Sequence, residues 1–189
     1  GKITTPEYVV DKATKLETLY NRIHEIRMRF EVLLREAEID FCRKCLSGDG
    51  SDRAELQAQF ETARGEIADD FAFVARCNIG AEFMDDEKIE RLRRIGSITW
   101  TRHLDDRIGI SREEARLKSG TAPPSLPAVE PVLADKPEHI VPRTDPAPFG
   151  ENPYGFTMQV PENLYNLGEL YNLSIRKGTL SPEERFKIN

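Results

Sequence analysis

Two of the three cysteines form a Cys-x-x-Cys pair, Cys42 and Cys45, inside a run of residues with helical periodicity. Residues three apart lie on one face of a helix, so the two thiols could supply half of a tetrahedral zinc site. The other half is hard to find, because Cys77 is expected at the opposite end of a helical hairpin, roughly 30–40 Å away. A redox pair would need a strand-to-helix setting, which the pattern does not predict. We interpret them as ordinary helix cysteines. The alternative is a metal site that Cys42, Cys45 and His103 complete across subunits.

The histidines and the acidic pairs do not form a catalytic constellation. His24, His103 and His139 each lack a second histidine or a carboxylate pair at metal-ligand spacing within their own segments. Neighbouring carboxylates in Asp69-Asp70 and Asp85-Asp86 point about 100° apart on a helix, so neither pair can act as general acid and base. No nucleophile elbow, Walker loop or dinucleotide fingerprint is present. The residues themselves therefore predict no catalytic group and no cofactor in this chain.

The composition is that of a protein with long, solvent-exposed helices. The 189 residues are 39% hydrophobic and 32% charged, and the net charge of -6 argues against a broad nucleic-acid-binding face. No apolar run approaches the roughly 18 residues that a membrane span needs, and no charged-then-apolar leader indicates secretion. Three cysteines do not make a disulfide framework. We therefore expect a cytoplasmic protein that neither binds nucleic acid nor inserts into membranes.

A long helix is expected over residues 14–46. Apolar residues recur there at alternating spacings of three and four, which is the a/d stripe of a coiled coil, and the other faces are charged. The stripe consists of Leu16, Leu19, Ile23, Ile26, Phe30, Leu33 and Ala37. Apolar residues off this seam, such as Met28 and Phe41, widen the surface beyond what one partner helix would cover. We predict that the stripe from Leu16 to Leu33 mediates self-association as a homodimer.

A second helix is expected over residues 52–78, antiparallel to the first. The turn SGDGSD at 47–52 separates the two, and Asp52 can cap the second helix. A short connection between two long helices makes them neighbours, so residues 14–78 should form a hairpin of coiled-coil character.

Shorter helices are expected after the hairpin. One should begin at Asp85-Asp86 and run through the apolar residues Ile89, Leu92 and Ile95, and another should begin at Trp100, His103 and Leu104. The segment SREEARL at 111–117 is a third, with Ser111 as its cap.

Residues 119–161 hold ten of the twelve prolines and cannot form one regular element. Enough apolar residues remain there for contact with a folded body, so we expect an ordered, extended strap with a hairpin that pairs 139–142 with 156–160. A short helix over 162–173 and a helix capped by Ser181 follow. The predicted fold class is mainly α: a long antiparallel helical hairpin, short helices and a Pro-rich extended strap.

Short motifs stand at both ends of the chain. The first is Gly1-Lys2-Ile3 with Thr5-Pro6 and Lys12, and the second is RKGTLSPEERFKIN at 176–189. The first resembles the segment after the His-Asp doublet of HD-GYP-type metal-dependent phosphohydrolases. The second resembles the next loop and helix of that domain, at Lys177, Gly178, Leu180, Ser181, Glu183 and Glu184. In the family the two segments are nearly contiguous, whereas about 160 residues lie between them here.

The resemblance implies a large helical insertion in an HD-type domain. Residues 1–13 and 162–189 would then belong to the host domain, 14–118 would be the helical insertion, and 119–161 the strap. The family hydrolyses cyclic dinucleotides, chiefly cyclic di-GMP, at a divalent metal centre of iron or manganese.

The chain departs from the family pattern at the catalytic residues. The His-Asp doublet would precede Gly1, the next metal-binding histidine would follow Asn189, and the Gly-Tyr-Pro segment is absent. Lys2 alone matches a residue beside the substrate phosphate in the family. We therefore expect a non-catalytic interaction region of a cytoplasmic signalling phosphohydrolase, acting by self-association or by gating the parent active site, with the rest of the HD-type domain as its partner. The alternatives are a hydrolase fragment with metal sites completed across subunits and a free-standing coiled-coil scaffold.

Overall fold

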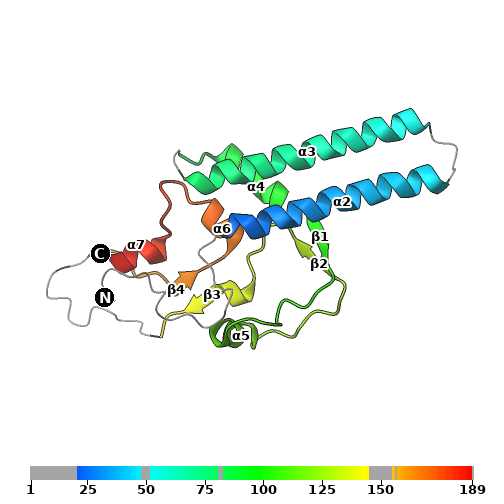
Figure 1. Cartoon of the computed structure of the whole chain (residues 1–189). Coiled ribbons are helices and arrows are strands. Elements are labelled where there is room, and N and C mark those ends of the chain that lie inside the picture. Colours follow the sequence, from blue (N-terminus) through cyan, green and yellow to red (C-terminus); the bar gives the residue numbers. More distant parts are fainter. Residues whose placement is uncertain (1–20, 48–51, 81–82, 145–154, 156, 189) are drawn as a thin grey trace, which may run out of the picture.

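The computed structural model describes residues 21–47, 52–80, 83–144, 155 and 157–188. Its helices are α2 (Ile23–Ser47), α3 (Arg53–Ile79), α4 (Asp86–Gly96), α5 (Arg112–Lys118), α6 (Glu169–Leu173) and α7 (Pro182–Ile188), with a 3-10 helix η1 (Pro137–His139). Its strands are β1 (Thr99–Arg102), β2 (Ala128–Pro131), β3 (Ile140–Pro142) and β4 (Asn163–Asn166). The fold is mainly α, as predicted, with two long helices packed together and small sheets beside them (Figure 1). None of the helices in the described ranges combines the length and the apolar character that a membrane crossing requires.

Helices α2 and α3 form the predicted antiparallel hairpin, whose tip reaches well beyond the other described elements (Figure 1). Two aromatic pairs join the helices: the ring centroids of Phe30 and Phe71 are 5.5 Å apart, and those of Phe41 and Phe60 are 5.2 Å apart. Phe30 and Phe41 are eleven residues apart on α2, and their partners Phe71 and Phe60 are also eleven residues apart on α3. The helices therefore keep one register between these pairs, and each aromatic contact stabilises the pairing beyond the area it buries.

The helix predicted over residues 14–46 is observed as α2 from Ile23, and the Ile23 amide donates to the side-chain oxygen of Asn21 at 3.1 Å. Residues 14–20 lie outside the described residues. The second helix begins where expected, because the Asp52 side chain accepts a hydrogen bond from the Ala54 amide at 2.9 Å.

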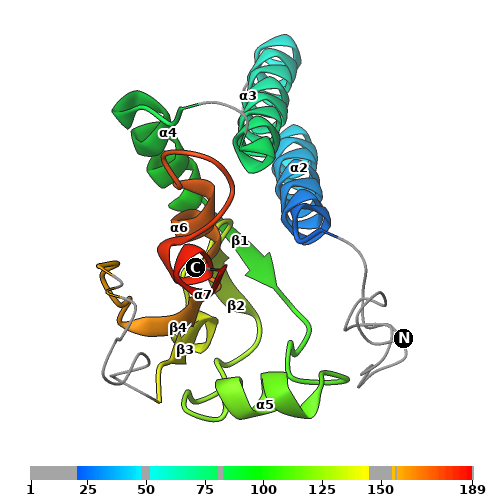
Figure 2. The same cartoon turned by 90° about the vertical axis from the view of Figure 1, so that its left-hand side faces the viewer.

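The hydrophobic core lies where the hairpin meets α4 and α6. Figure 2, which looks nearly along the hairpin, shows α4 to one side of it and α6 and the strands below. The residues expected to form the apolar face of α4, Ile89, Leu92 and Ile95, are buried. They belong to one cluster with Ile26, Phe30, Leu33, Phe73, Val74, Met84, Val132, Leu133 and Leu173. The half of the hairpin nearest α4 is therefore fixed to the body, while the tip is a pair of helices only.

Residues 99–102 form strand β1, so the helix predicted near Trp100 is wrong. β1 pairs antiparallel with β2, and Trp100 lies opposite Glu130. The apolar residues that suggested a helix span too few positions to exclude a strand. The residues Thr99-Trp100-Thr101 are β-branched and aromatic, which suits a paired strand. The pairing strand lies in the Pro-rich region, and local periodicity carries no information about that partner.

The described part of the Pro-rich region contributes η1 and the strands β2 and β3, which pair with β1 and β4 outside that region. The strand predicted at 139–142 is confirmed as β3, but its predicted partner at 156–160 is wrong, because β3 pairs with β4. The helix predicted over 162–173 is wrong in its first half for the same reason, since β4 occupies 163–166 and only α6 is helical.

Two predicted helix starts are confirmed. On α7 the Glu184 amide donates to Ser181 Oγ at 3.3 Å, and the Ser181 amide donates to Glu184 Oε2 at 2.8 Å, which is a reciprocal capping box. On α5 the Ser111 hydroxyl accepts from the Glu114 amide at 3.2 Å.

Candidate functional site at the root of the hairpin

The chemistry-bearing residues singled out from the sequence do not meet within the described chain. Cys42 and Cys45 lie near the tip end of α2, where Cys42 is exposed, and His103 is exposed just after β1. Within the described ranges, no group of three or more histidine, cysteine, aspartate or glutamate side chains could hold a metal ion. Lys2, Leu16 and Leu19 lie outside the described residues. A metal site shared between subunits stays a prediction.

The apolar stripe of α2 faces the core of its own chain. Ile26, Phe30 and Leu33 are 4%, 3% and 8% exposed, and Ile23 packs against the same cluster. Self-association through these four residues would require a surface that the fold has already covered. Their spacing predicts a helix-packing seam correctly, but the structure uses that seam within one chain.

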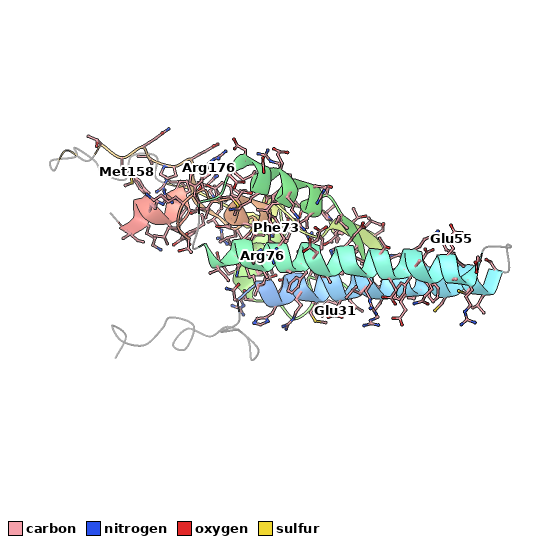
Figure 3. All side chains as sticks on the ribbon, turned by 90° about the horizontal axis from the view of Figure 1, so that it is seen from above. Glu31, Glu55, Phe73, Arg76, Met158 and Arg176 are labelled. Atoms are coloured by element: carbon pink, nitrogen blue, oxygen red, sulfur yellow. The ribbon has the colours of Figure 1, made fainter. Side chains whose placement is uncertain are left out.

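A pocket of about 480 Å³ opens at the root of the hairpin. Its walls come from segments distant in the sequence: the start of α2, the end of α3, the start of α4 with the residues just before it, helix α6 and the loop that follows it. Ile26, Phe73 and Leu173 supply part of its apolar wall, and Cys77 also faces it. Figure 3 shows Phe73 and Arg76 on the part of α3 that lies beside the body. The sequence did not predict this pocket, because the segments that form its walls are far apart in the chain and meet only in the folded protein.

The loop that carries the C-terminal motif is held by the root of the hairpin. The Met84 amide donates to the Arg176 carbonyl at 3.0 Å, and Arg176 Nη2 lies 2.6 Å from Asp86 Oδ1. Gly80 ends α3 with φ 63°, and a Cβ at Gly80 would lie 2.5 Å from Thr179 Cγ2. Glycine alone avoids both the left-handed strain and this clash, so the loop lies directly against the end of α3. We call this set of contacts the root joint.

A buried ion pair joins α2 to α6. Glu169 is 4% exposed, and its carboxylate accepts hydrogen bonds from Arg29 Nη1 at 2.6 Å, Arg22 Nη2 at 3.2 Å and the Ala134 amide at 2.9 Å. Burial by itself raises the pKa of Glu169, but the hydrogen bond and charge of Arg29, together with the amide, outweigh it and hold the pKa below its usual range. The carboxylate likewise raises the pKa of Arg29 against its burial. The pair is therefore ionised at neutral pH.

Other titratable groups near the pocket are arranged for structure. Burial raises the pKa of the Cys77 thiol, which keeps it protonated and weakly nucleophilic at neutral pH. Burial also lowers the pKa of His139, whose Nδ1 accepts from the Lys136 amide at 3.2 Å. The described pocket side chains therefore do not present an activated nucleophile beside a base.

The sequence carried one signal for the buried pair. Glu169 stands among leucines and a tyrosine in NLGELYNL, and a carboxylate buried there needs a cation or several hydrogen-bond donors. Its partner could not be named, because Arg29 is 140 residues away and is one of several arginines on α2.

No family model, curated protein or solved structure matches this chain. Relatives therefore add nothing to the resemblance between its two end motifs and HD-GYP phosphohydrolases.

Proposed function

We propose that this chain is a helical insertion in a cytoplasmic HD-type metal-dependent phosphohydrolase, and that its hairpin acts on the parent enzyme through the root joint. An insertion must leave its host domain and return to it at neighbouring points. Asn21 follows the segment with the N-terminal motif, Gly178 and Thr179 belong to the C-terminal motif, and all three line one pocket. This proximity of residues separated by nearly the whole chain is the observation that carries the proposal.

The contacts at the root joint favour gating over a passive spacer. Lys177 and Leu180 of the C-terminal motif are exposed, while the neighbouring Thr179 lies against Gly80 at the end of α3 and Arg176 binds Met84 and Asp86 at the start of α4. A displacement of α3 must either move this loop or break the contact between Gly80 and Thr179. By resemblance, the loop leads into a helix that precedes a metal-binding histidine, so its movement would reach the metal centre of the parent.

The chemistry belongs to the parent protein in this proposal. A divalent metal, iron or manganese, would supply hydroxide and hold the phosphate of a cyclic dinucleotide such as cyclic di-GMP. Lys2 would lie beside that phosphate. The family's metal ligands would come from residues outside Gly1–Asn189.

The test uses the full-length protein that contains this chain. We expect Mn²⁺-dependent hydrolysis of cyclic di-GMP, with kcat changed several-fold by Gly80→Val and unchanged by Gly109→Val. Both glycines have positive φ, 63° and 80°, but only at Gly80 would a Cβ strike a neighbour. The matched pair therefore separates disturbance of the root joint from backbone strain.

The outcomes distinguish the two parts of the proposal. A full-length sequence without a His-Asp doublet before Gly1, or a metal-loaded protein that hydrolyses no cyclic dinucleotide, would refute the family assignment and favour a free-standing scaffold. Equal kcat values for the two glycine variants would refute gating and leave the assignment standing. Light scattering addresses dimerisation, which a strict monomer at high micromolar concentration would exclude.

A further inference from the structure

We infer that the root pocket binds a small amphipathic carboxylate, a ligand with an apolar body and one carboxylate head. The pocket volume of about 480 Å³ falls within the range of small-molecule sites, about 300–1,000 Å³. Apolar side chains from three different helices, including Ile26, Phe73 and Leu173, supply walls for an apolar body. Transfer of such a body from water to these walls provides the main driving force for binding.

The charges around the pocket favour an anion. Its described lining includes three cations, Arg22, Arg76 and Lys88, and one carboxylate, that of Glu169. Arg22 is paired with Glu169, and Lys88 lies 3.4 Å from an oxygen of Asp85. This cationic rim occurs in a chain whose net charge is -6, so it does not follow from overall composition.

Arg76 is the residue that would meet the carboxylate. Among the described residues, its guanidinium makes no hydrogen bond or ion pair, although it lies on the last turn of α3 at the pocket. A guanidinium can bind both oxygens of one carboxylate through two parallel hydrogen bonds. A phosphate dianion would require further donors, and the other two cations on the rim already have partners.

Binding can be measured on the chain itself by titration calorimetry and by thermal shift, with decanoate, decanol and acetate below the micelle concentration. Decanoate should bind saturably, decanol about tenfold more weakly because it lacks the charge, and acetate not measurably because it lacks the apolar body. Arg76→Ala should weaken decanoate binding by at least about tenfold, and Arg76→Lys by less. Arg64→Ala is the matched control: Arg64 lies on the same helix, pairs with Glu61 and does not line the pocket.

A second measurement locates the ligand without relying on the arginine variants. In a Cys42→Ser/Cys45→Ser background, Cys77 is the remaining thiol and faces the pocket. Saturating decanoate should slow maleimide labelling of Cys77 several-fold. The inference is overturned if decanoate does not bind, if decanol binds equally well, if Arg76→Ala and Arg64→Ala behave alike, or if the labelling rate is unchanged. None of these readouts depends on phosphohydrolase activity, so the pocket and the proposed parent enzyme can fail separately.

Discussion

Replacing Glu169 by alanine should destabilise the fold far more than replacing Glu25, although both carboxylates bind the same arginine. The Glu169 side chain is 3% exposed and that of Glu25 is 63% exposed, while the Arg29 side chain between them is 11% exposed. Removing one partner of a buried pair costs about 3–5 kcal/mol, and Arg29 would keep the exposed Glu25 carboxylate and the Val132 carbonyl as acceptors but lose its buried counter-charge. The Ala134 amide also loses its acceptor. Loss of an exposed pair one helical turn apart costs less than about 0.5 kcal/mol.

The assay is urea unfolding followed by circular dichroism and by the fluorescence of Trp100, the single tryptophan. Trp100 is a local probe, since the Arg29 guanidinium lies 6.0 Å from its ring centroid. For a chain of this size, a loss of about 3–5 kcal/mol corresponds to a fall in Tm of roughly 6–20 °C. Equal losses for Glu169→Ala and Glu25→Ala, or a loss below about 1 kcal/mol for Glu169→Ala, would refute the assignment of a buried pair.

The Glu169 carboxylate should also make the free energy of unfolding depend on pH. The folded state lowers the pKa of Glu169 below its ordinary value of 4.5, so its contribution to stability is present above that value and is lost as the pH falls through the folded pKa. Glu169→Gln cannot titrate at this position. The difference in unfolding free energy between wild type and Glu169→Gln should therefore be constant at neutral pH and shrink below about pH 4.5. A difference that grows on acidification would contradict a lowered pKa of Glu169 in the folded state.

Three further predictions concern other parts of the fold. Gly80→Ala should destabilise the chain by at least about 1 kcal/mol more than Gly109→Ala in urea unfolding, and Thr179→Ser should recover part of that excess because it removes the clashing Cγ2. Leu92→Ala, at a fully buried position, should lose about 2–5 kcal/mol, and a loss below about 1 kcal/mol would contradict its place in the core. Burial, together with a hydrogen bond to the buried Glu183 carboxylate, raises the pKa of Tyr171 to about 12, so its contribution to stability should be lost between about pH 10 and 12. Ultraviolet titration should show one tyrosinate forming late, and Tyr171→Phe should abolish that step.

The parts of the fold that follow from local periodicity were predictable. The spacing in α2 and α4 identified their apolar faces, and Asp52, Ser111 and Ser181 marked helix starts through hydrogen bonds within a single turn. Ile26, Phe30 and Leu33 of the stripe predicted to mediate self-association pack within their own chain, because periodicity shows that a helix face is covered and not which element covers it.

The candidate site could not be predicted in the same way. Arg76 and Cys77 belong to an ordinary helix end in the sequence, and they become pocket residues only because α2, α6 and the loop after α6 surround them. The burial of the Glu169 carboxylate and its pairing with Arg29 depend on how α2 lies against α6.

By itself, the sequence determined the helical hairpin, its antiparallel pairing and the caps, because each depends on residues within a few turns or across one short connection. Only the tertiary structure decided that residues 99–102 pair with 128–131, that the α2 stripe faces its own chain and that a pocket opens at the hairpin root. These features join segments far apart in sequence, and their stability comes from packing and buried charge that no local pattern records.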